Sequence, residues 1–200
     1  MSTIELYLDP ICPFAWVTSR WLLAAAATTG RDVTLRQMSL AVLNDDREMS
    51  PAQQAKMSRS HRIGRVFAAA VATGDPGALA GLYDALGAQI HTGERELTDG
   101  VVNEALASCG ADPALADALD DPSWDDAVRT SHQRSQELLG GAGGSPILVV
   151  DDVAFFGPVL TSLPDPDAGT ALLDAVVTAA STPGFAVLQR PYQGPPSMAR

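Results

Sequence analysis

The stretch IELYLDPICPFAW, residues 4–16, decides the fold because it passes from a strand through a tight turn into a helix. Its first five residues, IELYL, predict a short strand. Pro10 and Pro13 flank the turn, and Pro13 is suited to the first position of a helix because it has no N–H to leave unpaired. The helix is predicted to end at Gly30, since glycine is a typical C-terminal stop.

The rest of the chain adds strands on both sides of a long helical region. Residues 33–38 (VTLRQM) alternate and are rich in strand-forming residues, so they predict a second strand and complete a β-α-β unit. Residues 147–156 (ILVVDDVAFF) predict a hairpin whose two-residue turn is Asp151-Asp152. A last helix is expected over residues 167–181. The chain therefore ends with a β-β-α unit.

The middle of the chain has helical patterns and no strand pattern. The last of its helices is expected to begin at Ser123, with Asp126 at the spacing of a capping box. The predicted helices cover residues 51–73, 76–91, 98–109, a short segment from Asp112-Pro113, and 123–139.

This order of elements predicts an α/β protein with a thioredoxin fold, in which an all-helical insertion separates the β-α-β half from the β-β-α half. That arrangement is the DsbA-like variant. We assign residues 1–45 and 140–190 to the thioredoxin-like domain and residues 46–139 to the helical insertion. Residues 191–200 are proline-rich and are expected to form a loosely held tail.

Composition excludes several classes of function. The chain has 200 residues and a formal net charge of -11, which argues against nucleic acid and against an anionic membrane surface as partners. The N-terminus lacks the basic and apolar regions of a signal peptide, and the apolar run 22–27 is too short to cross a bilayer. We therefore expect a cytoplasmic protein, in which the two cysteines are free thiols.

Cys12 is the candidate nucleophile because it precedes the helix that begins at Pro13. Its sulfur is expected to face the free N–H groups of Phe14 and Ala15, where the helix carries about half a positive charge. A helix-end interaction of about 2 kcal/mol corresponds to roughly 1.5 pKa units. From an unperturbed value of about 8.5, this predicts a Cys12 pKa near 7 and a thiolate at neutral pH. The alternative is a buried, inert cysteine at a helix start.

Ser145-Pro146 is the second candidate part of the site. A proline after a glycine-rich loop and just before a buried strand matches the cis-proline that faces the cysteine in thioredoxin folds. A cis peptide bond here is expected to leave the backbone of Ser145 open to pair with a thiol substrate. The alternative is an ordinary trans proline at the start of a strand.

Further candidates are less specific. Trp16 follows Cys12 by one helical turn and is expected to border the pocket. His61 and Arg62 belong to the basic segment RSHRIGR, which could present arginines to an anionic ligand across from Cys12 or could be a solvated helix face. Asp9 could relay protons or cap the turn. The histidine and cysteine spacing matches no zinc motif, so no metal is expected, and Cys109 is assigned to packing.

The chain resembles the DsbA-like oxidoreductases of actinobacteria, in particular the family of mycothiol-dependent reductases of the nitroreductase type. The resemblance implies that Cys12 is the catalytic nucleophile, that Pro146 is the cis-proline, and that mycothiol or another low-molecular-weight thiol is the cofactor, bound by Pro13, Phe14, Ser145 and Pro146. It also draws attention to His132 as a pocket residue. The resemblance is carried by DPICPFAWVTSRW, QMSLAVLN, LYDALGAQIH, Ser131-His132 and GSPILVVDDVAFFGPVL.

Two departures from the family pattern bear on function. The motif here is the monothiol version Cys-Pro-Phe-Ala, in which Ala15 removes the second, resolving thiol. Where the family tends to have Trp-Gly-Pro, this chain has His61-Arg62-Ile63, and that segment helps to form the wall of the active-site groove. An internal disulfide is therefore disfavoured, since it needs a thiol at position 15 to release the mixed disulfide.

Three functions remain open. In the first, Cys12 attacks a disulfide or a small electrophile, and a mycothiol-type thiol completes the turnover. In the second, reversible thiol addition to a conjugated polyene or enone gives cis–trans isomerisation, as in the related hydroxychromene-carboxylate isomerases. In the third, the protein is a non-catalytic binding module and tolerates Cys12→Ser. The expected partner is a small or carrier-bound substrate, and a homodimer remains open.

Overall fold

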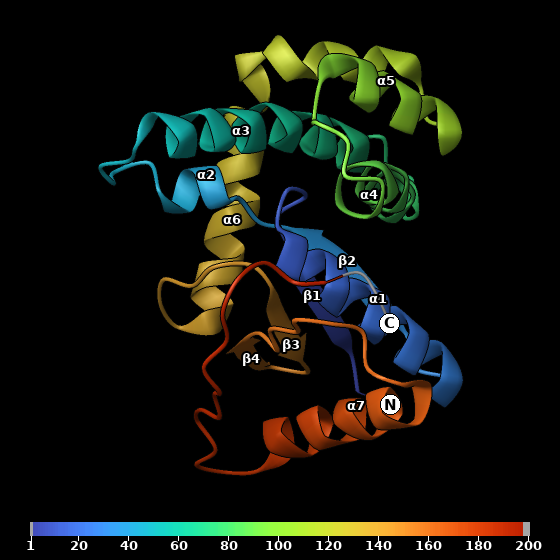
Figure 1. The fold of residues 1–200 in the computed structure, drawn as a ribbon, viewed down its shortest axis with the longest axis vertical. Helices are drawn as coiled ribbons and strands as arrows, with labels where there is room; N and C mark the ends of the chain where they lie inside the picture. Colours follow the sequence, from blue (N-terminus) through green and yellow to red (C-terminus); the bar gives the residue numbers. More distant parts are fainter. Residues whose placement is uncertain (1, 198–200) are drawn as a thin grey trace.

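A four-stranded sheet in the order β2-β1-β3-β4 forms the centre of the fold (Figure 1). The structure is a computed structural model that describes residues 2–197. Strand β1 pairs in parallel with β2 and antiparallel with β3, and β3 pairs antiparallel with β4. This arrangement confirms the predicted thioredoxin-like plan. The strands are β1 (Ile4–Leu8), β2 (Val33–Gln37), β3 (Ile147–Val150) and β4 (Val153–Phe156).

Helix α1 (Pro13–Thr29) makes the crossover between the two parallel strands. It ends as predicted at Gly30, which adopts the left-handed conformation with φ of 66°. Helix α7 (Pro166–Ser181) packs beside α1, and the Trp21 indole Nε1–H donates to the carbonyl oxygen of Gly169 at 2.8 Å. The helix that Cys12 caps is thus tied to α7 by one buried hydrogen bond.

The helical insertion lies at the opposite end of the molecule from α7 (Figure 1), and α6 leads from it back to the sheet. Helix α2 (Leu40–Leu43) precedes the insertion, whose elements are α3 (Pro51–Ala72), α4 (Ala78–Gly87), the π-helix η1 (Ala88–Thr92), α5 (Asp99–Ser108), the 3₁₀-helices η2 (Pro113–Asp120) and η3 (Pro122–Trp124), and α6 (Asp125–Leu139).

Two details of the insertion differ from the sequence prediction. The predicted capping box at Ser123 is wrong: α6 begins at Asp125, and Trp124 at its N-cap makes no side-chain cap. The carboxylate of Asp121 instead accepts the Ser123 N–H at 2.9 Å and starts the short 3₁₀ turn η3. The helix predicted over 76–91 is an α-helix only to Gly87 and then widens into η1.

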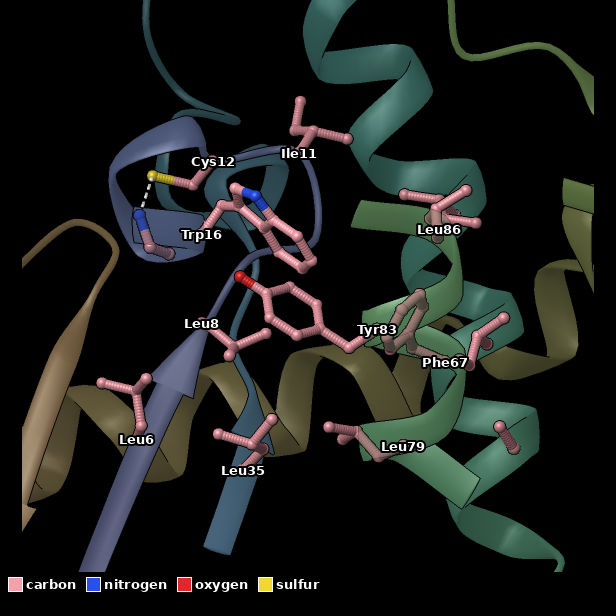
Figure 2. Close-up of a cluster of buried hydrophobic side chains, with 14 of the residues drawn as sticks. Leu6, Leu8, Ile11, Cys12, Trp16, Leu35, Phe67, Leu79, Tyr83 and Leu86 are labelled. Carbon is pink, nitrogen blue, oxygen red and sulfur yellow. Dashed lines mark hydrogen bonds between the residues drawn. The ribbon is translucent and has the colours of Figure 1, made fainter. Parts of the chain in front are cut away.

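One continuous hydrophobic core joins the sheet to the insertion (Figure 2). Leu6 and Leu8 of β1 and Leu35 of β2 face Phe67 of α3 and Tyr83 of α4, all of them buried. A smaller cluster covers the other face of the sheet. It consists of Tyr7, Met38, Ile147 and Val149.

The chain beyond α7 runs without regular structure along the sheet to the start of α1 (Figure 1). The ring of Phe185 contacts Phe155 of β4, and the ring of Tyr192 contacts Phe14 of α1 at a centroid distance of 5.2 Å. These ring contacts place the segment beside the first turn of α1. Within residues 2–197, no helix is both long enough and apolar enough to cross a membrane.

Candidate active site

Cys12 occupies the N-cap of α1, where the sequence predicted it. Its backbone is extended, and its sulfur accepts the N–H of Ala15 at 3.5 Å, drawn as a dashed line in Figure 2. Pro13 at the first helical position has no N–H and therefore donates no hydrogen bond to the sulfur. The end of β1 and the start of α1 thus hold one thiol against the positive end of a 17-residue helix.

The loop before β3 faces Cys12 from the other side. The Ser145–Pro146 peptide bond is cis, as expected from the sequence. The Cys12 thiol donates to the carbonyl oxygen of Ser145 at 3.3 Å, and the Ser145 hydroxyl oxygen accepts the backbone N–H of Asp9 at 2.9 Å. The expectation that the Ser145 backbone is open to a substrate therefore needs correction, because its carbonyl is occupied by the Cys12 thiol.

The predicted low pKa of Cys12 is wrong for this arrangement. Cys12 is only 5% exposed, and this burial raises the pKa of the thiol. The N–H of Ala15 and the side chain of Ser145 lower the pKa, the nearby charge of Asp9 raises it, and the N–H of Phe14 lowers it; burial dominates. The pKa near 7 was predicted from the helix end alone, and desolvation of the thiol has the larger effect on its pKa here. The structure therefore favours the protonated thiol over the thiolate at Cys12.

The raised pKa predicts the pH dependence of alkylation. In a Cys109→Ser background, the rate of Cys12 alkylation by iodoacetamide should still rise between about pH 7 and about pH 9, with a midpoint above the value of about 8.5 for an unstructured cysteine. The reason is that iodoacetamide reacts with the thiolate form of Cys12, and burial shifts the formation of that thiolate to higher pH. Mass spectrometry of the alkylated protein measures the rate. A rate that levels off below about pH 8 would contradict the raised pKa.

Asp9 lies directly under the Cys12 turn and is only 1% exposed. One carboxylate oxygen accepts the N–H of Ile11 at 2.9 Å, and the other accepts the N–H of Leu40 at 2.6 Å and the hydroxyl of Ser60 at 2.7 Å. Burial raises the pKa of Asp9, and these hydrogen bonds act against that rise. Of the two roles weighed from the sequence, the turn cap is present, and it extends to α2 and α3.

His91 and Trp16 support the same turn from the insertion side. His91 Nε2 is 3.0 Å from the carbonyl oxygen of Pro10, and because a carbonyl can only accept, this nitrogen carries the proton. The His91 ring packs 5.7 Å from the Trp16 ring, and burial lowers the pKa of His91. No role was predicted for His91 from the sequence, because a π-helix is not visible in the hydrophobic spacing. The π-helical turn is what brings this ring to Pro10.

Trp16 was expected to border the pocket at Cys12, but the cavity of about 360 Å³ that it lines does not have Cys12 in its wall. The guanidinium of Arg20 lies 4.2 Å over its ring, and Leu163 and Pro164 close the cavity from the loop before α7. Trp21 also contributes to this wall, although it is 3% exposed and belongs to the core.

His61 and Arg62 are engaged in ion pairs within the insertion. Arg62 binds the carboxylates of Asp99 at 2.8 Å and Asp120 at 3.0 Å. His61 Nε2 lies 2.9 Å from a carboxylate oxygen of Asp125. These pairs favour the second of the two interpretations, a polar helix face, over a cationic wall opposite Cys12.

His132 is a buried residue of α6, 7% exposed, that lines a shallow depression together with Val42 and Leu43 of α2. Burial lowers its pKa, and its Nδ1 has no hydrogen-bond partner among residues 2–197. The depression lies along α2 and α6 and is distinct from the cavity beside Trp16. Within residues 2–197, no group of three or more His, Cys, Asp or Glu side chains could hold a metal ion.

Comparison with known proteins supports this description of the fold. The uncharacterized protein Rv2286c of Mycobacterium tuberculosis is 35% identical over 196 residues, which are 96% of this chain and 83% of that protein. Among solved structures, the probable DsbA oxidoreductase SCO1869 from Streptomyces coelicolor superposes with a TM-score of 0.61 at 20% identity, covering 96% of this chain and 94% of that one. A 2-hydroxychromene-2-carboxylate isomerase superposes with a TM-score of 0.57 at 15% identity, covering 87% and 94%.

The two structural likenesses show the DsbA-like thioredoxin fold, and the family follows from sequence. A family model described as mycothiol-dependent nitroreductase Rv2466c matches residues 11–190, from the residue before Cys12 to beyond α7. The chain therefore belongs to the Rv2466c-like family of mycothiol-dependent nitroreductases.

Proposed function

We propose that this thiol-dependent oxidoreductase uses Cys12 as its only nucleophile and takes its second thiol from solution. The observation that carries the proposal is the position of the Cys12 sulfur, at the N-cap of α1 between the Ala15 N–H and the carbonyl of Ser145. A sulfur at this point can attack from the helix end while a substrate chain lies against the cis-proline loop. Membership of a mycothiol-dependent family supports a low-molecular-weight thiol as the reductant.

The reaction is written as three thiol–disulfide exchanges at Cys12. The Cys12 thiolate attacks one sulfur of a disulfide, forms a mixed disulfide, and releases the other half as a thiolate, which takes up the proton that Cys12 lost. A thiol of the mycothiol type then attacks this mixed disulfide, releases the remaining half of the substrate as a thiol, and becomes disulfide-linked to Cys12. A second such thiol attacks that disulfide and releases Cys12. In sum, one disulfide and two small thiols give two substrate thiols and one small-thiol disulfide, so the electrons balance.

An external thiol fits this site because the chain offers no internal one next to Cys12. Ala15 is fully buried and occupies the position three residues after the nucleophile. The second cysteine, Cys109, is also a free thiol, but its sulfur donates to the carbonyl of Leu106 at the end of α5. The residues that would hold a small thiol are Pro13, Phe14, Ser145 and Pro146, and the chemistry it would supply is the second and third exchanges.

A second candidate is cis–trans isomerisation of a conjugated substrate. Ala15 favours it, because reversible addition of one thiol to a double bond needs no resolving cysteine. The thiol adds, the former double bond rotates, and elimination restores the thiol and the double bond, so nothing is oxidised. The structural likeness to a 2-hydroxychromene-2-carboxylate isomerase makes this chemistry a natural alternative for the fold.

The net charge of -11 further favours a small or carrier-bound substrate over a nucleic acid. Two free thiols agree with a cytoplasmic location. A homodimer remains part of the proposal and is tested by sedimentation of the purified protein.

One experiment separates the two reactions. The protein is incubated with mycothiol and a fluorogenic mixed disulfide, and separately with a conjugated enone of defined geometry. We expect turnover of the disulfide with consumption of mycothiol. Isomer exchange of the enone without thiol consumption would favour the isomerase instead. If neither substrate is converted and the purified protein only binds the thiol, the binding-module interpretation replaces both.

A further inference from the structure

The buried carboxylate of Asp9 is the one charged group in the Cys12 turn, and the reaction written above does not use it. It is only 1% exposed, and both of its oxygens are occupied by hydrogen-bond donors. Those donors come from three different segments: Ile11 in the turn, Leu40 at the start of α2, and Ser60 in the middle of α3. None of the ion pairs formed by residues 2–197 includes Asp9.

This pattern of donors suits a carboxyl group and not an amide. The two oxygens each accept a backbone N–H, from Ile11 and from Leu40, at 2.9 and 2.6 Å. An amide of the same shape would place its NH₂ group against one of these two N–H donors, whichever way it turned. Burying a carboxylate without a cation is costly, so hydrogen bonds to charged groups must offset it. A residue kept only to cap a turn would not need to be charged and buried.

The main chain of Asp9 connects this cluster to both sides of the Cys12 sulfur. Its carbonyl oxygen accepts the backbone N–H of Cys12 at 3.0 Å. Its own N–H donates to the hydroxyl oxygen of Ser145 at 2.9 Å, in the residue whose carbonyl accepts the Cys12 thiol. A displacement of Asp9 therefore changes the position of the nucleophile and of the loop that faces it.

We propose that Asp9 is the positioning residue of Cys12, and that its hydrogen bond to Ser60 fixes the Cys12 turn to the helical insertion. The proposal deepens the proposed function, on which it rests for the identity of the nucleophile. When α3 and the sheet keep their relative positions, the Ser60 hydroxyl holds the carboxylate, and the carboxylate holds the turn. When α3 moves away, the bond breaks and the sulfur loses its alignment with Ser145.

The charge of Asp9 also acts on Cys12, which gives the proposal a readout beyond stability. Its negative charge disfavours the thiolate and contributes to the raised pKa of Cys12. The other titratable groups around the turn are Tyr83 of α4, His91 of η1, and Lys56 of α3, whose charge acts on Asp9. A neutral residue at position 9 is therefore expected to lower the pKa of Cys12.

The first test removes only the link to the insertion. In a Cys109→Ser background, Ser60→Ala is compared with Ser135→Ala, since both serines are buried but Ser135 donates within its own helix, to His132. The probe is dithiodipyridine, an aromatic disulfide whose released thiopyridone is followed by absorbance in the absence of any small thiol. We expect Ser60→Ala to slow the reaction of Cys12 about tenfold, the size of effect that a small misplacement produces. Ser135→Ala should stay within about twofold.

The second test changes the charge. Asp9→Asn is expected to shift the midpoint of the Cys12 pH–rate profile to lower pH and to lower its plateau about tenfold. Adding Ser60→Ala to Asp9→Asn should have little further effect on the rate, because Ser60 acts through the carboxylate.

The proposal is overturned if Ser60→Ala reacts as fast as Ser135→Ala or faster, or if Asp9→Asn lowers the melting temperature but leaves the profile of the folded protein unchanged. If Asp9→Asn does not fold, the test rests on the comparison of Ser60→Ala with Ser135→Ala in the rate of reaction with dithiodipyridine. Because dithiodipyridine reacts with Cys12 directly, these outcomes are independent of whether mycothiol proves to be the reductant.

Discussion

Cys12→Ser is expected to lower thiol-dependent disulfide turnover by at least about a thousandfold, the scale on which loss of a catalytic nucleophile acts. The serine hydroxyl can still accept the N–H of Ala15 at the N-cap of α1, because serine is a preferred N-cap residue. The fold should therefore persist. The chemistry cannot, since an alcohol neither ionises near neutral pH nor forms a disulfide. The measurement is the initial rate with mycothiol and a fluorogenic mixed disulfide.

Cys109→Ser is the matched control, since Cys109 is the only other cysteine of the chain. It is half-buried at the end of α5, and its thiol donates to the carbonyl of Leu106. We expect its turnover to stay within about twofold of the wild type, because it takes no part in any of the exchanges. Full activity in Cys12→Ser would remove the nucleophile from both proposed reactions. A loss in Cys109→Ser as large as in Cys12→Ser would mean that both thiols are needed for turnover.

The fold could be predicted because its signals are local. Pro13 and Gly30 mark the two ends of α1, and both positions are as expected. The Asp151-Asp152 turn fixes the β3–β4 hairpin, and Asp151 adopts the positive φ of 53° that such a turn needs. Once the order of elements, β-α-β followed by β-β-α, is established, the right-handed crossover rule allows only a few arrangements of the strands in the sheet.

The interior of the site could not be predicted, because its contacts join residues far apart in the chain. Asp9 and Ser60 are separated by 51 positions, and His91 and Pro10 by 81. No pattern within either segment indicates these pairs. The four-residue helix α2, which supplies the Leu40 N–H, is also too short for a periodic signal.

The error in the pKa of Cys12 has the same origin. The helix N-terminus is a local feature and is present as predicted, with Ala15 donating to the sulfur. Burial depends on what the rest of the chain places around the thiol, including Asp9 and the cis-proline loop with Ser145. Desolvation outweighs the helix end, so the sign of the shift changes.

Gly87→Ala is expected to destabilise the protein by about 1–3 kcal/mol, the usual cost of overpacking a core. Gly87 is the last residue of α4, and a Cβ there would lie 2.2 Å from Cζ3 and 2.4 Å from Cε3 of Trp16. Contacts on several sides hold the indole in place. Its Nε1–H donates to Thr92, Arg20 lies over its face, and the ring of Tyr83 meets it at 5.5 Å.

The control is Gly81→Ala in the same helix, where the nearest atom to an added Cβ is Cβ of Cys109 at 3.7 Å, an ordinary contact. Removing a helix-interior glycine there should stabilise the protein by up to about 1 kcal/mol. Thermal unfolding should therefore move in opposite directions for the two variants, by about 2–4 °C for each kcal/mol in a chain of this size. Because Trp16 follows Cys12 by one turn of α1, Gly87→Ala should also alter the reaction of Cys12 with dithiodipyridine, whereas Gly81→Ala should not. Equal melting temperatures for the two variants would mean that Trp16 is free to move, and that the packing of α1 against η1 does not hold the Cys12 turn in place.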